Sequence, residues 1–267
     1  MADNLFMGQD GFTWFIGVVE DRADPEKAGR VRVRCLGFHS ADLKIIPTTD
    51  LPWASVMMPV TAGGNSGIGF SPHFLIEGTW VVGFFRDPAK QEPVIMGALP
   101  GFNSDETTGF TIASSSAIGG QSIEGGFKDP NSKYPTELYI KKPDTNLLAQ
   151  ESVDTHASKD LKHTLTEKWT TATGQAEHPA STQSSAKYPT NHVFETESGH
   201  YVEFDDTTGN ERIHLFHKKG TYIEIDSTGN VVIKTVGNVT NIVAGNMDTY
   251  VAKNYNLSVG GTMGVWV

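Results

Sequence analysis

The chain has 267 residues, 38% apolar and 19% charged, and its 28 glycines and 13 prolines favour frequent turns over long helices. Its 21 basic and 31 acidic residues give a net charge of -10, which argues against binding to a nucleic-acid backbone. The lone Cys35 excludes an internal disulfide and a cysteine-rich metal site. Residues 1–10 lack the features of a signal peptide, and no apolar run approaches the roughly 20 residues of a membrane span, so we expect a soluble protein.

Short β-rich runs alternate with turns over the first 100 residues. Five such runs predict a small closed or partly closed barrel. The runs are residues 12–20, 30–38, 53–58, 80–86 and 93–98. Valine and arginine alternate from Arg30 to Arg34, so we expect the valines to face the core and the arginines to face solvent.

Residues 102–192 have a different composition. Leu, Ile, Val and Phe occupy 13 of these 91 positions, which is too little apolar surface for an independent core. Leu161, Leu165 and Trp169 stand at helical spacing and indicate one short amphipathic helix. The rest of the segment is predicted to be an extended polar linker.

The chain becomes repetitive from residue 193 onward. Residues 199–210 are echoed by residues 220–230, and each copy reads as a strand followed by a Gly-Asn turn. An eight-residue period follows, and its apolar members all fall at odd-numbered positions, hence on one face of an extended chain. These residues are Val239, Val243, Met247, Val251, Tyr255, Val259 and Met263.

An eight-residue strand-and-turn unit cannot bury a core by itself, and its open edges would invite aggregation. We therefore expect several chains to wind together into a fibrous β-helix closed by rotational symmetry, with the seven apolar residues as its core. The alternative is an ordinary β-meander whose periodicity arose by chance.

The candidate catalytic motifs are weak. The glycine-rich stretch 63–69 lacks the Gly-Lys-Ser/Thr end of a phosphate loop. His214 and His217 stand three positions apart, so a strand would point them to opposite faces, and we interpret both as surface histidines. Glu195 and Glu197 lie in the strand repeats, where solvation explains them better than a glycosidase site does. We predict no catalytic residue, no cofactor and no metal site.

Several segments closely resemble the OB-fold of central spike proteins from contractile-tail phages, and more loosely the VgrG spikes of type VI secretion. The barrel segments are FIGVVEDR (15–22), DPEKAGRVRV (24–33), LPWA (51–54), SGIG (66–69), GFFRD (83–87) and QEPVIMG (91–97). The resemblance continues through GFKDP (126–130), PDTNLLA (143–149), NHVFETESGH (191–200) and GNERIH (209–214).

The resemblance implies an all-β chain with three parts. Residues 1–101 would form an OB-fold barrel that docks on a ring-shaped hub, residues 102–192 an extended linker, and residues 193–267 the strands of an intertwined triple-stranded β-helix needle. It implies a homotrimer and a separate hub protein, because residues 1–11 leave no room for fused hub domains. The shortness of the needle implies either that the natural needle is stubby or that a separate PAAR-like tip protein caps it. The expected location is the tail baseplate of a virion assembled in the host cytoplasm.

The best-known family member carries a lysozyme domain between barrel and needle, and such a domain needs roughly 100 to 200 residues. The 91-residue linker is too short and too polar to hold one. We therefore expect a non-enzymatic spike that punctures the host cell envelope. Two alternatives stay open: a peptidoglycan-degrading tail lysozyme, and an OB-fold protein that binds single-stranded nucleic acid.

Overall fold

The computed structural model is all-β, as predicted, with two short 3-10 helices and no α-helix among the residues it describes. Those residues are 13–70, 72–100, 145–149, 169–171, 174–176, 186–257 and 259–265. Within them, no helix has the length and apolar character needed to cross a bilayer. The chain divides into two compact units, Met1–Asp144 and Thr145–Val267, which are described separately below.

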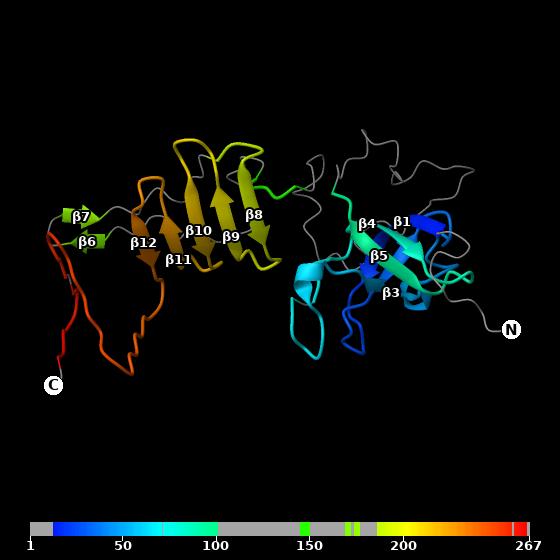
Figure 1. Cartoon of the computed structure of the whole chain (residues 1–267), viewed down its shortest axis with the longest axis horizontal. Helices are drawn as coiled ribbons and strands as arrows, with labels where there is room; N and C mark the ends of the chain where they lie inside the picture. The colour runs from blue at the N-terminus through cyan, green and yellow to red at the C-terminus, as the bar shows by residue number, and fades with distance from the viewer. Residues whose placement is uncertain are drawn as a thin grey trace. The chain divides into compact units, whose positions relative to one another are not determined.

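Five strands close the barrel of the first unit (Figure 1). They are β1 (Thr13–Asp21), β2 (Val31–Cys35), β3 (Trp53–Val56), β4 (Trp80–Phe85) and β5 (Pro93–Ala98). Their order is β1-β2-β3-β5-β4, and β4 pairs back onto β1. All neighbours are antiparallel except β3 and β5. This closed five-stranded barrel agrees with an OB fold and confirms the five predicted runs.

The barrel core consists of inward side chains from all five strands. Fully buried members include Val31 and Val33 of β2, as the alternation predicts. Gly83 lies where β4 and β5 shift register, and a Cβ there would sit 2.1 Å from the carbonyl oxygen of Val94 and 2.6 Å from the ring of Phe15. Glycine is therefore required at this position, because any side chain would push the two strands apart.

One part of the β2 prediction is wrong: Arg34 does not face solvent. Its side chain is completely buried, and its Nε and Nη2 donate to the two carboxylate oxygens of Glu20 on β1, at 2.5 and 3.0 Å. It also donates to the carbonyls of Ser40 and Ile46 in the β2–β3 loop. A charged residue can be completely buried when a partner on the neighbouring strand neutralises it, and strand alternation alone does not reveal that partner.

Five further strands form an antiparallel meander in the second unit, in the order β12-β11-β10-β9-β8. They are β8 (Asn191–Glu195), β9 (Tyr201–Asp205), β10 (Arg212–Phe216), β11 (Tyr222–Ile225) and β12 (Val231–Lys234). The two repeated Gly-Asn turns lie where the sequence places them. Gly209 and Gly229 both adopt positive φ, at 79° and 81°.

Two other predictions concern the linker and the octads. A small hairpin of β6 (Trp169–Thr171) and β7 (Gly174–Ala176) occupies part of the linker, so Trp169 begins a strand instead of ending a helix. The predicted helix positions Leu161 and Leu165 lie outside the described residues. The octad residues form no strand within 235–257 and 259–265, so they make no meander with one another.

Candidate functional site

The β8–β12 sheet has two chemically different faces. Alternate residues of each strand point to opposite sides, and the antiparallel register aligns them in rows across all five strands. One face carries polar and aromatic side chains that are buried within the chain. The other carries apolar side chains that are exposed, so the usual relation between burial and polarity is inverted.

An ionic cluster occupies the centre of the covered face. Arg212 Nη2 lies 2.6 Å from Glu203 Oε2, and Arg212 Nη1 lies 3.5 Å from Glu224 Oε2. Asn191 Nδ2 donates to the other oxygen of Glu203 at 2.8 Å, and His214 Nδ1 lies 3.6 Å from Glu203 Oε2. The two carboxylates thus share one guanidinium, with the imidazole beside them. Such a network fixes the register of the four neighbouring strands β8 to β11.

The environment of this cluster shifts two pKa values. Burial alone would raise the pKa of Glu203, but the hydrogen bond with His214 and the charge of Arg212 outweigh it, and the pKa is lowered. Burial and the nearby Glu203 carboxylate raise the pKa of Tyr201. Glu203 therefore stays ionised although it is fully buried.

His214 corrects a second expectation from the sequence, because it is only 1% exposed and is not a surface histidine. Its ring packs against Tyr201, Phe216 and Tyr222, with ring centroids 5.2 to 5.7 Å apart. His217, which follows the strand, is exposed as predicted. Alternation did not single out this cluster, because β9 carries aromatic residues of both parities: Tyr201 lies on the face of Glu203, and Phe204 lies on the opposite face.

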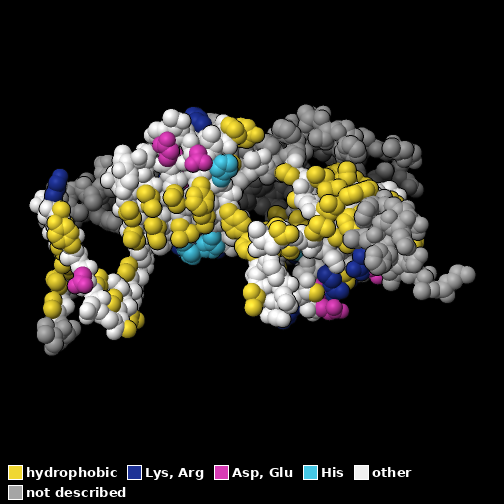
Figure 2. All heavy atoms as spheres, viewed as in Figure 1, with side chains coloured by type: hydrophobic (Ala, Val, Ile, Leu, Met, Phe, Trp, Pro, Cys, Tyr) yellow, Lys and Arg dark blue, Asp and Glu magenta, His cyan; other side chains and the backbone are white. Residues whose placement is uncertain are grey.

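The exposed face of the sheet is mainly apolar over β8 to β12, with His192 of β8 as a polar residue at its edge. Figure 2 shows it as a band of hydrophobic side chains. Eight large apolar residues on this face are each between 37% and 67% exposed. They are Phe194, Phe204, Ile213, Leu215, Ile223, Ile225, Val231 and Ile233. We call them the sheet surface. A soluble monomer rarely exposes so large an apolar patch, which indicates an interface.

The seven predicted needle residues lie beyond β12 and contact no core in the single chain. All of them are exposed, from 43% for Val251 to 75% for Val239. The single chain therefore brings none of them together, and their assignment as a shared core stays a prediction about the assembled protein.

The barrel adds two smaller apolar surfaces. The first, the strand surface, lies on the outer wall of β1, β4 and β5. Trp14, Ile16 and Met96 are 52%, 41% and 42% exposed, and Val82 and Val94 beside them are half-buried. The register places Trp14 opposite Phe84, whose rings meet edge-on at 5.8 Å, and Ile16 opposite Val82.

The second, the apolar loop, comprises residues 57–76 between β3 and β4 and contains no Asp, Glu, Lys or Arg. Five of its large apolar side chains are between 47% and 100% exposed. They are Met57, Val60, Ile68, Phe70 and Phe74. The glycine-rich stretch 63–69 is the tip of this loop, which Figure 1 shows projecting from the barrel.

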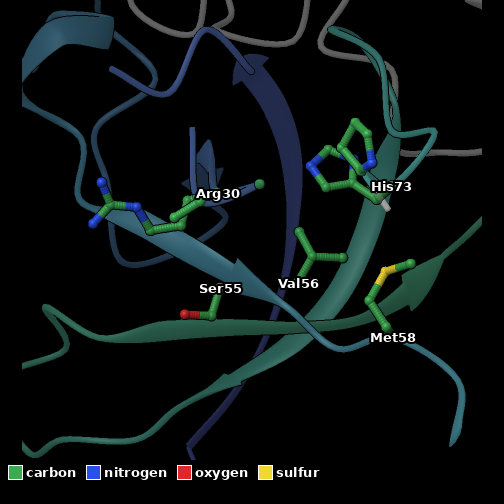
Figure 3. Close-up of a pocket in the computed structure, with 8 residues that line it drawn as sticks. Arg30, Ser55, Val56, Met58 and His73 are labelled. Atoms are coloured by element: carbon green, nitrogen blue, oxygen red, sulfur yellow. The ribbon is translucent and has the colours of Figure 1, made fainter. Parts of the chain in front are cut away.

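A shallow pocket of about 140 Å³ also opens on the barrel, and Figure 3 shows its lining residues. Arg30 borders it but donates two hydrogen bonds to Asp24, at 3.0 and 2.8 Å, so its charge is already neutralised. His73 accepts a hydrogen bond from the backbone N–H of Leu75 at 3.0 Å, and the Ser55 hydroxyl points away from it in Figure 3. The pocket therefore presents no paired nucleophile and base.

Within the described residues no group of three or more His, Cys, Asp or Glu side chains is arranged to hold a metal ion.

Comparison with known proteins places the chain among phage proteins. The family model described as the Gp5 N-terminal OB domain matches residues 38–191. Protein Gp5 of Vibrio phage KVP40 is 38% identical over 289 aligned residues, covering 96% of this chain and 65% of the relative. The pre-baseplate central spike protein Gp5 of Enterobacteria phage T4 is 39% identical over 149 residues, covering 54% of this chain and 23% of the relative. The chain thus spans less than two thirds of the length of either relative.

Proposed function

Because the chain belongs to the Gp5 N-terminal OB domain family, we propose that it is a structural central spike of a contractile-tail baseplate. In this role it forms a homotrimer in the virion tail, docks through its barrel on a hub protein, and transmits the thrust of contraction to the host cell envelope. The observation that carries the proposal is the sheet surface, whose eight apolar side chains are exposed in the single chain. A tip protein of the PAAR type would complete the point.

The sheet surface supports the trimer on energetic grounds. Each of its eight side chains is about half-exposed, so burying the remainder against other copies contributes roughly 1 kcal/mol per side chain. Among the described strands, β8 and β12 lie at the two edges of this sheet, where pairing with another chain can add strands. Three copies arranged about an axis, with the sheet surfaces inward, would bury these apolar side chains and leave the ionic clusters facing outward from the axis.

The octads extend the same arrangement into a needle. Three extended chains wound around one axis would stack Val239, Val243, Met247, Val251, Tyr255, Val259 and Met263 into a continuous core. Inter-chain strand pairing resists axial load because many backbone hydrogen bonds must break together. This mechanical resistance is the property that a puncturing device needs.

The proposed role is not enzymatic. The relative from phage T4 is named as a central spike protein, which supports a structural role. A lysozyme activity is the second candidate, and lysis of purified cell wall by this chain alone, seen by zymography, would overturn the non-enzymatic assignment.

The mass in solution tests the trimer directly. Size-exclusion chromatography with light scattering is expected to give about 87 kDa, three times the chain mass of 29.0 kDa. A mass of one chain, unchanged when hub protein is added, would contradict both the trimer and the needle.

A matched pair of variants tests which octad residues face the axis. Val251→Asp would place three carboxylates at one level of an apolar core, at a cost of several kcal/mol each, and is expected to abolish the trimer. Tyr250→Asp is the control. Tyr250 precedes Val251, so it points to the opposite side of an extended chain, and its side chain is already 91% exposed. An unchanged mass and melting curve for Val251→Asp would refute the inward assignment.

A further inference from the structure

Two histidines lie side by side at one end of the sheet surface. Phe216 of β10 pairs with Tyr201 of β9, so His217 and His200, one residue further out, face each other across the two strands. Their rings are in contact, with centroids 4.4 Å apart. Each follows or precedes an aromatic side chain of the covered face, so alternation puts both histidines on the side of the sheet surface. Figure 2 shows histidine side chains beside the apolar band. We call these two residues the histidine pair.

The backbone ladder continues through the histidine pair. The N–H of Thr196 donates to the carbonyl of His200 at 2.8 Å, and the N–H of His217 donates to the carbonyl of Thr221 at 2.8 Å. A polar row thus follows the last apolar row of the sheet surface. β12 reaches the same end of the sheet at Lys234, and the octads follow it. The histidine pair therefore lies at the end from which the chain leaves the sheet for the needle segment.

Each ring of the pair accepts a backbone hydrogen bond, which fixes the position of its own proton. The N–H of Lys218 donates to His200 Nδ1 at 3.3 Å, and the N–H of Lys219 donates to His217 Nδ1 at 3.2 Å. An accepting Nδ1 carries no hydrogen, so each neutral ring has its proton on Nε2. A second proton would enter at Nδ1, where it would face an N–H donor and break the hydrogen bond. Acid therefore removes the bond that ties the β10–β11 turn to His200.

The charges around the pair also oppose its protonation. Two cations and two carboxylates flank it on the β10–β11 and β8–β9 sides, and they are Lys218, Lys219, Glu195 and Glu197. Within the described residues no ion pair of 4.0 Å or less joins either ring to a carboxylate, and Glu195 Oε2 instead accepts a hydrogen bond from Asn146 at 2.5 Å. Burial and the charges of His217 and Lys218 lower the pKa of His200 already in the single chain.

The position of the pair connects this property to assembly. If three copies turn their sheet surfaces toward one axis, as proposed above, the same face carries the histidine pair toward that axis. Closing the trimer then removes water from the rings and brings the pairs of three chains together, and both changes disfavour a charged imidazole.

We propose that the histidine pair is an acid-sensitive layer of the trimer interface, which packs while its rings are neutral and loosens when they are protonated. This inference rests on the proposed trimer and adds its regulation by pH. A ring that binds its proton less readily in the trimer than in the separate chain stabilises the trimer at neutral pH. That contribution is lost as the pH falls below the ordinary histidine value of about 6.5.

The mass of the full-length chain tests this layer. Light scattering is measured over a series of protein concentrations at about pH 7.5 and about pH 5.5, on either side of the histidine range. If dilution alone does not dissociate the trimer, the same sub-denaturing urea concentration is added to every sample. We expect the concentration of half-dissociation to be at least about ten-fold higher in acid, because the separated chains take up protons that the trimer excludes. Far-UV circular dichroism of the same samples should show that the sheet stays folded.

Three variants locate the effect. His200→Gln combined with His217→Gln removes both titratable rings and keeps polar side chains, so the half-dissociation concentrations at the two pH values should agree within about two-fold. His217→Gln alone should give an intermediate response, and it guards against misfolding because this ring is exposed in the single chain. His192→Gln is the matched control. His192 lies on the same face at the other end of β8, with Nε2 3.9 Å from Asp206 Oδ2, so its proton has a counter-ion and its loss should leave the acid response unchanged.

Different failures would refute different parts of the proposal. A trimer of equal stability at both pH values, or a double variant that keeps the ten-fold response, would overturn the acid-sensitive layer and leave the proposed trimer intact. Loss of the circular dichroism of the sheet before the mass falls would place the acid response within the single chain, and would also overturn the layer. A single-chain mass at about pH 7.5 would refute the trimer and the layer together.

Discussion

The buried pair of Arg34 and Glu20 provides the sharpest test of how the barrel is held together. Arg34 joins β2 to β1 through Glu20, and it also ties down the β2–β3 loop through the carbonyls of Ser40 and Ile46, at 2.5 and 2.8 Å. Thr48 in the same loop donates to Glu20 Oε2 at 2.7 Å. We predict that Arg34→Met, which keeps an apolar stem of similar length, strongly destabilises the barrel.

The size of the effect follows from what the substitution leaves behind. Both side chains are essentially inaccessible, at 0% and 1% exposed, so removal of the guanidinium leaves a buried carboxylate without its counter-ion. Breaking one half of a buried pair costs about 3–5 kcal/mol. The double variant Glu20→Met with Arg34→Met removes both charges and is expected to recover most of that loss, because a well-packed apolar pair is often as stable as the ion pair.

Urea unfolding of the full chain, followed by fluorescence of the barrel tryptophans Trp14, Trp53 and Trp80, measures this loss. With a slope of about 1–3 kcal/mol/M, the barrel midpoint should fall by roughly 2 M for Arg34→Met. If Arg34→Met lowered the free energy of unfolding by less than about 1 kcal/mol, or if the double variant were less stable than the single one, the claim that Arg34 and Glu20 neutralise each other's charge would be refuted.

Two other predictions concern groups with shifted pKa values. Burial raises the pKa of the Cys35 thiol to about 12, so iodoacetamide at pH 8 should leave the native protein unlabelled and should alkylate Cys35 only in urea, as intact mass will report; equal labelling in both states would contradict the burial. Burial, the His217 ring and Lys218 lower the pKa of His200 below 6.5, so the folded state binds this proton less readily than the unfolded state, and its contribution to stability is lost as pH falls below that value. An NMR titration midpoint for His200 at or above 6.5 would contradict this sign, and His200→Gln should reduce the acid sensitivity of the melting temperature.

The sequence predicted the barrel well because its strands are read from local alternation and turns. β1 to β5 lie where the five runs placed them, and the Gly-Asn turns of the sheet also lie where the repeats placed them. The errors fall on residues whose partner is distant in the sequence. Arg34 pairs with Glu20 across two strands, and His214 meets Glu203 across β9 and β10, so neither contact leaves a local signal.

Trp169 shows a different limit, since it begins a strand although its spacing from Leu165 is helical, and so few residues at helical spacing do not establish a helix. The apolar surfaces show a third limit of prediction from the sequence. Composition indicated that the octads need other chains, but it did not reveal that the β8–β12 sheet already exposes its apolar side, because the sequence does not state which face of an alternating strand the chain itself will cover.

The inverted burial of the sheet connects fold and assembly. If a monomer were the final state, covering Glu203, Arg212 and His214 while exposing the sheet surface would be unfavourable on both faces. The arrangement becomes favourable when other copies cover the apolar side, and the ionic cluster then fixes the strand register before they arrive. From β10 onward the exposed apolar residues of the sheet are all odd-numbered, as are the apolar octad positions that follow β12. The same odd-numbered apolar pattern would thus line the proposed trimer axis from the sheet surface into the needle core.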